Sequence, residues 1–358
     1  RMRAGLDVRY FEDLLESLVC ETQHSALVEV VPVEQLEEDE VTHVLKERER
    51  MLTDEQTQTI RDDVAALRVR QETPDAPEDV AKLPRLHVSD IKPAKPWPDF
   101  ALREDGPLPC LQHVMSTHGI DYFNAYFDLK GIAWEDLPYV RLLCMLLGAL
   151  ETETHTAAEV DTWSRTHLGS LRFSLEISAE YKNLNAVTPR LKVTSSALSE
   201  QLVHLGSIPR EVWETTRFTD AARIHSILVQ RRVAIEQAMM LEGHSAAMQR
   251  AESYVFPACL FQEQTGGVDF YLFLRDLIEH YDERAEDLAQ QLERVRSQIF
   301  VADRFTGSFA GSEKDYDIFW KVAGTLGLVY AGQPDKLVFP EPVVKREAFV
   351  VPTDVVYV

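Results

Sequence analysis

The chain has 358 residues, of which 45% are hydrophobic, so it can bury one large core or two smaller ones. Its 59 acidic and 37 basic residues give a net charge of −22, which argues against nucleic acid and against an anionic membrane surface as partners. This charge permits basic substrates, although solubility is the simpler explanation. No apolar run reaches the length of a bilayer span, and no signal-peptide core is present. The chain begins at Arg1 without an initiator methionine, so we expect a piece excised from a longer protein.

The cysteines are few and scattered, and no two of them form a C-x-x-C pair. They are Cys20, Cys110, Cys144 and Cys259. This pattern indicates reduced structural thiols, so we expect a cytoplasmic location, or an organelle matrix in a eukaryote.

The N-terminal segment predicts three helices and one strand. Apolar residues recur at helical spacing from Val8 to Val19, and Ala26–Val31 is a strand-like run that a proline ends. The next helical segment has acidic residues at its start and basic residues at its end, as the helix dipole favours. Thr53 and Gln56 then form a capping box that opens another helix. We therefore expect two antiparallel helices between Glu37 and Pro74, standing off from the main domain as a hinge.

A linker and a sheet nucleus follow. Pro84–Pro109 contains six prolines and no periodicity, which is typical of a linker. The β-rich runs Leu111–Met115 and Ile120–Leu129 flank a short glycine-containing turn, and this predicts a β-hairpin. The segment from Pro138 to Gly148 is apolar nearly all round, which predicts a helix that lies under the sheet, buried on most sides.

The second run of the hairpin has two different faces, because successive side chains of a strand point to opposite sides. The apolar face carries Phe123, Ala125, Phe127 and Leu129. The amphipathic face carries Tyr122, Asn124, Tyr126 and Asp128. The amphipathic face could contact an extended peptide, but ordinary sheet packing is the favoured explanation.

The rest of the chain predicts one more strand pair and many helices. Strict alternation from Leu171 to Ser178 indicates a half-buried antiparallel strand, and Arg190–Thr194 is a plausible partner. Helical stripes dominate afterwards, until Trp320 ends the domain. Ala348–Val358 is strand-like again, and we predict that it pairs with Ala26–Val31 or with a neighbouring molecule, because an orphan strand exposes unpaired backbone groups.

Three groups of residues stand in a recognisable order. The first is Gln71-Glu-Thr-Pro-Asp-Ala-Pro-Glu78, with Leu83-Pro-Arg-Leu86 and Asp90-Ile91 after it. The second is Thr117-His-Gly-Ile-Asp-Tyr122, with Phe127-Asp-Leu129 and Leu137-Pro-Tyr-Val140. The third is Gly243-His-Ser-Ala-Ala-Met-Gln-Arg-Ala251, with Gly267-Val-Asp-Phe-Tyr271. Together they resemble the linker and third domain of presequence-protease-like enzymes, which belong to the pitrilysin/insulinase family of zinc metallopeptidases.

The resemblance implies an α+β fold, in which helices pack on an antiparallel sheet as in mitochondrial processing peptidase and a helical hairpin precedes the domain. It divides the chain into four parts. These are the tail of a preceding domain (1–34), a helical hairpin linker (35–92), a non-catalytic metallopeptidase-like domain (93–332) and the start of a following domain (333–358).

The family's zinc site is an H-x-x-E-H motif on a helix of its first domain, where two histidines bind the metal and the glutamate activates water. None of the 11 histidines here fits that pattern, and the corresponding place holds Leu137-Pro-Tyr-Val-Arg-Leu142. The resemblance therefore implies no catalytic residue and no metal ligand in this chain, and zinc only in a full-length parent. The partners it implies are an N-terminal catalytic half of the same polypeptide and peptide substrates.

Other residue groups give weaker signals. His113 and His118 lie across a turn, and two solvated or hydrogen-bonded imidazoles are the favoured interpretation. Glu151, Glu153 and His155 would share one face of an extended segment as an adventitious metal site, but they precede a capping threonine, so a solvated loop is favoured.

Two further motifs have structural explanations. Gly266-Gly267 has no Lys-Ser or Lys-Thr after it, so it predicts a turn and not a phosphate loop. Arg231-Arg232 is a single basic pair inside a long helix and predicts a solvated face. No G-x-S-x-G elbow marks a nucleophile.

The favoured hypothesis is a non-catalytic portion of a zinc metalloendopeptidase that degrades short unstructured peptides, with this portion forming the chamber wall opposite the zinc domain. The alternative is a stand-alone peptide- or protein-binding scaffold without chemistry. An independent hydrolase with an unrecognised site is a third and weaker hypothesis.

Overall fold

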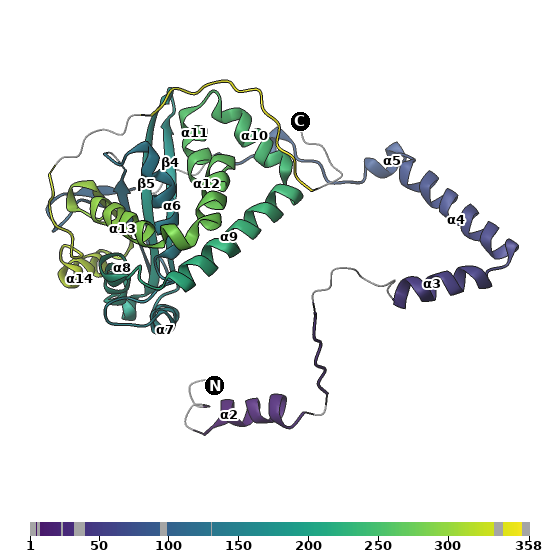
Figure 1. Ribbon diagram of the computed structural model, residues 1–358, viewed down its shortest axis with the longest axis horizontal. Coiled ribbons are helices and arrows are strands. Elements are labelled where there is room, and N and C mark those ends of the chain that lie inside the picture. The colour runs from purple at the N-terminus through teal and green to yellow at the C-terminus, as the bar shows by residue number, and fades with distance from the viewer. Residues whose placement is uncertain are drawn as a thin grey trace. The chain divides into compact units, whose positions relative to one another are not determined.

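The structure is a computed structural model that describes residues 5, 8–22, 24–31, 40–93, 99–129, 131–332 and 339–352. The chain divides into two compact units, Arg1–Ala94 and Lys95–Val358, which are described separately (Figure 1). The finer division into four parts remains a prediction.

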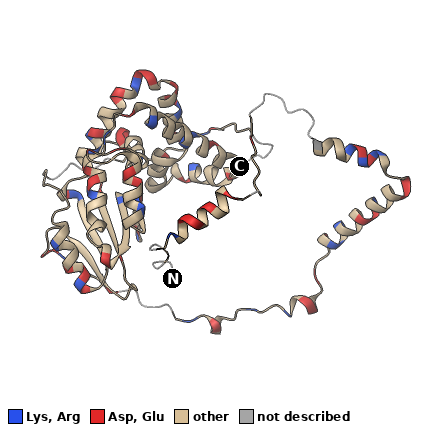
Figure 2. Ribbon diagram, turned by 90° about the horizontal axis from the view of Figure 1, so that it is seen from below, with Lys and Arg blue, Asp and Glu red and all other residues tan. Residues whose placement is uncertain are grey.

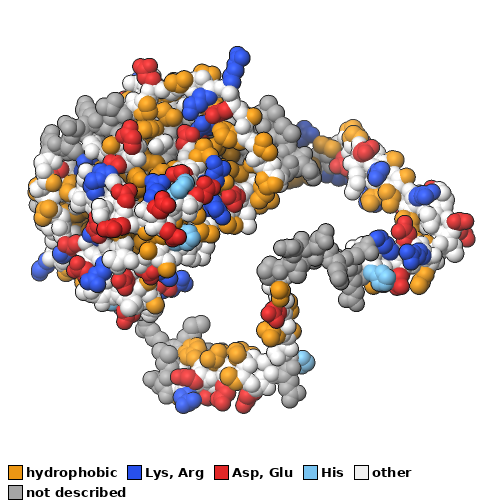
Figure 3. Space-filling model, viewed as in Figure 1, with side chains coloured by type: hydrophobic (Ala, Val, Ile, Leu, Met, Phe, Trp, Pro, Cys, Tyr) orange, Lys and Arg blue, Asp and Glu red, His pale blue; other side chains and the backbone are white. Residues whose placement is uncertain are grey.

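The first unit consists of short helices with little buried surface. Its helices are α2 (Tyr10–Leu15), which a π-helical turn (Glu16–Cys20) continues, α3 (Glu40–Met51), α4 (Asp54–Glu72) and α5 (Pro77–Val80). Helix α2 is amphipathic, with hydrophobic atoms along one side and acidic atoms along the other (Figure 3). Phe11 and Leu14 on α2 are each 40% exposed, so this apolar side is only partly covered.

The strand predicted over Ala26–Val31 is wrong. Residues 24–31 adopt no regular secondary structure, and the side chains of Leu27 and Val30 are almost fully exposed. A strand satisfies its backbone N–H and C=O groups only through a partner, and no described strand lies beside this segment. Apolar composition alone therefore did not suffice to form a strand here.

Two helices do form between Glu37 and Pro74, as the sequence predicts. Thr53 caps α4: its Oγ1 accepts a hydrogen bond from the Gln56 N–H at 3.2 Å, while Gln56 Oε1 accepts one from the Thr53 N–H at 3.0 Å. The apolar stripe of α4 remains about half exposed, at 44% for Val64 and 52% for Leu67. The hinge role of these helices stays a prediction.

The second unit is an α+β domain around one six-stranded sheet, which confirms the predicted fold class. Its strands are β1 (Ala101–Arg103), β2 (Cys110–Val114), β3 (Ile120–Asp128), β4 (Ser170–Glu180), β5 (Asn183–Leu198) and β6 (Phe305–Gly311). Its helices are α6 (Leu137–Leu146), α7 (Ala157–His167), α8 (His204–Thr215), α9 (Ala221–Leu241), α10 (Gly243–Ser253), α11 (Pro257–Gly266), α12 (Val268–Glu279), α13 (Tyr281–Ile299) and α14 (Glu313–Ala323). The strand order is β1-β2-β6-β3-β5-β4.

The hairpin predicted from Leu111 to Leu129 is wrong, because β6 lies between its two strands. β6 runs parallel to β2, where His113 faces Ala310, and antiparallel to β3, where Phe123 faces Phe309. The chain thus turns back after β2 but leaves space for one strand between β2 and β3. That space is occupied by β6, which comes much later in the chain.

Small residues suit β6 to this central position. A Cβ atom at Gly307 would come within 3.0 Å of Cys110 Sγ and 3.3 Å of Phe123 Cε2, so only glycine fits between β2 and β3 without a shift. Every second residue of β6 is buried, and Phe305 and Phe309 supply its apolar side chains.

The strand pair β4–β5 confirms the prediction of an antiparallel pair, with Leu175 opposite Leu191. The helix predicted at Pro138–Gly148 is confirmed as α6, in which Leu142, Leu143 and Leu146 are buried. Helix α6 packs against β4, α11 and α13, so it lies between the sheet and an outer helical layer.

The two faces of β3 differ as predicted, and its apolar face organises the core. Phe123 packs against Phe319 of α14, with ring centroids 4.7 Å apart, and Phe127 packs edge-on against Trp213 of α8 at 5.7 Å. Both phenylalanines are buried. Aromatic contacts of this kind contribute beyond the area that they bury.

The described C-terminal segment, residues 339–352, is extended but unpaired. Phe339 packs edge-on against Trp134, and Val350 is fully exposed. Val28, Val30 and Val350 have no strand partner among the described residues, and Val356 lies outside them. Pairing of these segments with a neighbouring molecule stays a prediction. Within the described ranges, no helix is long and apolar enough to cross a membrane.

Candidate functional site

The segment that corresponds to the family's zinc motif, Leu137–Leu142, lies at the start of α6. Its first residues, Leu137, Pro138 and Val140, are buried core residues with no metal-binding atoms. Across the described ranges, no group of three or more His, Cys, Asp or Glu side chains could hold a metal ion. The described residues therefore do not fit a zinc site.

The amphipathic face of β3 is the most extended candidate surface. Asn124 lies opposite Thr194 of β5, and the Thr194 hydroxyl donates a hydrogen bond to Asn124 Oδ1 at 2.9 Å. Tyr126 receives the ammonium group of Lys192 over its ring, 5.3 Å from the centroid. Tyr122 at the start of the strand is 43% exposed.

Charges of both signs accompany this face. Lys192 Nζ lies 3.5 Å from Glu176 of β4, and Figure 2 shows basic and acidic residues interspersed over the strands. Aromatic rings, an amide and paired charges can contact a peptide of mixed composition.

The two histidines of the β2–β3 region do not form a pair. His113 lies on β2, and its ring faces Phe100 with 5.7 Å between ring centroids. His118 lies in the turn with a left-handed backbone, φ 55°, followed by Gly119 with φ 82°. The structure thus places one histidine on a strand and the other in a turn, and the solvated or hydrogen-bonded state of their rings stays a prediction.

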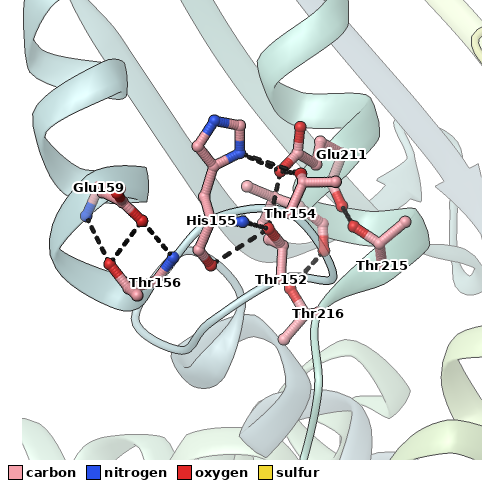
Figure 4. A network of polar contacts seen from close by, with 9 residues as sticks. Thr152, Thr154, His155, Thr156, Glu159, Glu211, Thr215 and Thr216 are labelled. Carbon is pink, nitrogen blue, oxygen red and sulfur yellow. Dashed lines mark hydrogen bonds and ion pairs between the residues drawn. The ribbon is translucent and has the colours of Figure 1, made fainter.

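Glu151, Glu153 and His155 do not converge on one point. His155 instead turns to Glu211 of α8, with its Nδ1 2.6 Å from Glu211 Oε1 (Figure 4). The hydroxyls of Thr152 and Thr154 donate to the same carboxylate oxygen at 2.7 and 2.6 Å. The Glu211 carboxylate thereby connects the loop before α7 to α8.

The hydrogen bonds of this network control the charge of Glu211. Burial alone would raise its pKa, but the hydrogen bonds from Thr154, His155 and Thr152 outweigh burial and hold the pKa of Glu211 below its usual range. The His155 ring also stacks on Trp163 of α7, 4.8 Å between centroids. No described part of the network is aligned with a separate nucleophile, so we assign it a structural role.

The Arg231-Arg232 pair has two different environments on α9. Arg232 Nε lies 3.6 Å from the Glu236 carboxylate and, like Arg231 Nε, is buried without a hydrogen-bond partner among the described residues. Arg231 lines a cavity of about 210 Å³, and its buried Nε has no hydrogen-bond partner among the described residues. Both side chains are partly exposed and each has a buried Nε, so the predicted solvated face is only partly solvated.

A buried charge cluster was not foreseen from the sequence. Arg250 of α10 is 6% exposed, and its guanidinium lies 2.8 Å from Glu263, 2.9 Å from Asp269 and 2.6 Å from Glu347. Burial would lower the pKa of Arg250, but the hydrogen bonds with these carboxylates raise it, so the guanidinium group stays protonated. The Arg250 hydrogen bond is also the main reason that the pKa of Glu347 falls below its usual range.

Glu263 is the most buried member, at 1% exposure, and has three donors. These are Arg250 Nη1, Gln249 Nε2 at 3.1 Å and the Val268 N–H at 3.1 Å. The last of these lies at the start of α12, so Glu263 caps this helix from α11. Gly266 is the last residue of α11 and Gly267 alone separates it from α12, so the turn predicted at Gly266-Gly267 is a bend at Gly267 only.

The comparisons with known proteins agree over most of the chain. The sequence profile of the family described as associated with peptidase M16, subfamily C, matches residues 31–277. Protein HypA of Clostridium perfringens is 31% identical over 323 residues, which cover 89% of this chain and 33% of that protein. Presequence protease 1, chloroplastic/mitochondrial, of Arabidopsis thaliana is 24% identical over 97% of this chain and 33% of its own length.

A solved structure of a peptidase M16 inactive domain from Pseudomonas fluorescens superposes with a TM-score of 0.44 at 13% identity, covering 68% of this chain and 53% of that one. The chain spans about a third of the length of the curated relatives it matches.

Proposed function

The chain belongs to the family of domains associated with peptidase M16, subfamily C, and from this premise we propose that it is the non-catalytic portion of a zinc-dependent metalloendopeptidase. The family resemblance inferred from the sequence is thereby confirmed. The parent enzyme would degrade short unstructured peptides, and zinc would be held by its other portion. The proposal is carried by the match to presequence protease 1 over 97% of this chain but only 33% of that enzyme.

The proposed role is that of a chamber wall opposite the zinc domain. It is supported by the amphipathic face of β3, where Tyr122 is exposed and Lys192 and Glu176 offer opposite charges. Such a surface can contact extended peptides of varied sequence without cleaving them. The partners in this proposal are the catalytic half of the same polypeptide and peptide substrates. A cytoplasmic or organelle-matrix location is part of the proposal, since the relatives' names include mitochondrial and chloroplast proteases.

The test begins with the complete reading frame, which should encode an H-x-x-E-H motif outside this chain. The full-length parent is then compared with a variant that lacks residues 95–332. We expect both to bind one zinc ion per chain, whereas only the parent cleaves an unstructured basic peptide. Equal cleavage by the deletion variant would exclude the wall role. A reading frame without the motif would support the alternative of a binding scaffold.

A further inference from the structure

Arg231 lines a cavity, and its Nε is buried without a hydrogen-bond partner among the described residues, although the side chain as a whole is only partly buried. The chain carries 59 acidic against 37 basic residues, so a partly buried arginine has many possible carboxylate partners. Arg250 and Arg294 each have one or more, at 2.9 Å or less. Arg231 Nε is buried and has none among the described residues. A buried polar atom is normally hydrogen-bonded, so an unpartnered one calls for an explanation.

A second arginine strengthens the positive potential there. Arg141 of α6 also has a buried Nε without a hydrogen-bond partner in the described part of the chain. Burial lowers the pKa of Arg231, and the positive charge of Arg141 lowers it further, although Arg141 itself does not line the cavity. A guanidinium group without a carboxylate in contact favours a bound anion.

The cavity determines the size and nature of that anion. Its volume is about 210 Å³, whereas an apolar cavity of roughly 150 Å³ holds a benzene molecule. Ala234, Ile235 and Ala238 of α9, with Ala246 and Val268 opposite, make most of its wall apolar. The space therefore suits one ring or branched alkyl group that carries a short acidic arm.

Neither acidic residue that lines the cavity forms an ion pair with Arg231 among the described contacts. Glu263 is engaged by Arg250, Gln249 and the Val268 N–H. Glu242 lies eleven residues after Arg231 (242 − 231), which is roughly 16 Å along the helix axis. At this distance the Glu242 carboxylate does not pair with Arg231, and a ligand that contacts Arg231 does not contact Glu242. One negative charge on the ligand, placed at Arg231, is therefore sufficient.

We propose that the cavity between α9, α10 and α12 binds a small apolar monocarboxylate, with its carboxylate on Arg231 and its apolar group along Ala234 and Ala238. The same chemistry is offered by a free aryl- or alkyl-carboxylic acid and by the C-terminal residue of a peptide. The site is independent of the proposed peptidase role, because it does not involve the amphipathic face of β3.

The experiment is calorimetric titration of the whole chain with 3-phenylpropionate and with its amide. We expect the acid to bind at least roughly tenfold more tightly than the amide, since a hydrogen-bonded charge contributes about 1.5–3 kcal/mol. A short peptide that ends in phenylalanine, with a free or an amidated C-terminus, distinguishes the two sources. Binding of the free-ended peptide indicates a peptide terminus, and binding of 3-phenylpropionate alone indicates a free acid.

Three variants separate this site from general charge effects. Arg231→Gln should weaken binding roughly tenfold to a hundredfold, while Arg232→Gln, its neighbour on the Glu236 side, should bind like the wild type. Ala238→Leu should block the cavity with Arg231 in place. Arg231→Gln without ligand should melt no lower than the wild type, because it removes a buried Nε that has no hydrogen-bond partner among the described residues.

The proposal is overturned by any of three results. The first is absence of binding at about 10 mM acid, ten times a millimolar Kd. The second is equal binding of acid and amide. The third is equal loss of binding in Arg231→Gln and Arg232→Gln.

Discussion

Replacement of Leu146 tests the packing of α6, on which the whole second unit depends. Leu146 is fully buried, on a helix that contacts β4, α11 and α13. Truncation to alanine removes apolar contacts and leaves a cavity, which costs about 2–5 kcal/mol in comparable cores. Replacement by aspartate also buries a carboxyl group without a hydrogen-bond partner, which adds about 1–3 kcal/mol. We therefore expect Leu146→Asp to lower the free energy of unfolding by roughly 3–8 kcal/mol, out of a typical 5–15 kcal/mol.

The assay is urea unfolding followed by tryptophan fluorescence, because Trp213 and Trp320 are buried in the second unit. Leu241→Ala is the matched control, since Leu241 is 80% exposed at the end of α9, and its effect should stay within about 0.5 kcal/mol. The order of unfolding midpoints should be wild type and Leu241→Ala, then Leu146→Ala, then Leu146→Asp. A midpoint for Leu146→Asp equal to that of the wild type would refute the buried position of α6.

Three further predictions concern the sites. Gly267→Ala should destabilise the chain, because the added Cβ would clash with Glu263 Oε1. Gly266→Ala is the control and should not destabilise it, because a Cβ there would meet no atom within 4 Å. The melting temperatures of the two variants test this difference. Glu211 has a pKa held below its ordinary 4.5, so its stabilising contribution is present above that pH and is lost as the pH falls through the lower, folded value. Glu211→Gln should therefore reduce stability near neutral pH and flatten its decline below pH 4.5, as urea midpoints across that range would show; an unchanged profile contradicts the network. Tyr122→Ala in the full-length parent should raise KM for peptide substrates with little change in kcat or melting temperature, and an unchanged KM would remove this face from the chamber wall.

Local patterns were sufficient for some elements of the second unit. The strict alternation of β3 separated its apolar face from its amphipathic face correctly, because a half-buried strand imposes a period of two. The continuous apolar character of α6 predicted a helix covered on most sides. Both properties depend on neighbours in the sequence, and both could be predicted for that reason.

Long-range pairing could not be predicted in the same way. β6 has only Phe305 and Phe309 as large apolar residues, and its place between β2 and β3 depends on the absence of a side chain at Gly307. The sequence showed two strands around a turn but contained no sign of the strand between them. Conversely, Ala26–Val31 had strand composition and lacked a partner, so composition overstated the structure there.

The sites show the same division. The cluster around Arg250 joins Glu263, Asp269 and Glu347, which are 13, 19 and 97 residues away in sequence (263 − 250, 269 − 250 and 347 − 250). The run from Gly243 to Ala251, which carries part of the family resemblance, contains Arg250, and this was the only available signal. His155 was considered with its sequence neighbours, whereas its partner Glu211 lies on another helix.

The most direct test of the central claim is zinc content and peptidase activity of this chain alone, prepared without a metal-binding tag. The account predicts far less than one zinc ion per chain by elemental analysis, and no cleavage of an unstructured basic peptide, with or without added zinc. One tightly bound zinc ion per chain, together with cleavage that a chelator abolishes and zinc restores, would contradict it.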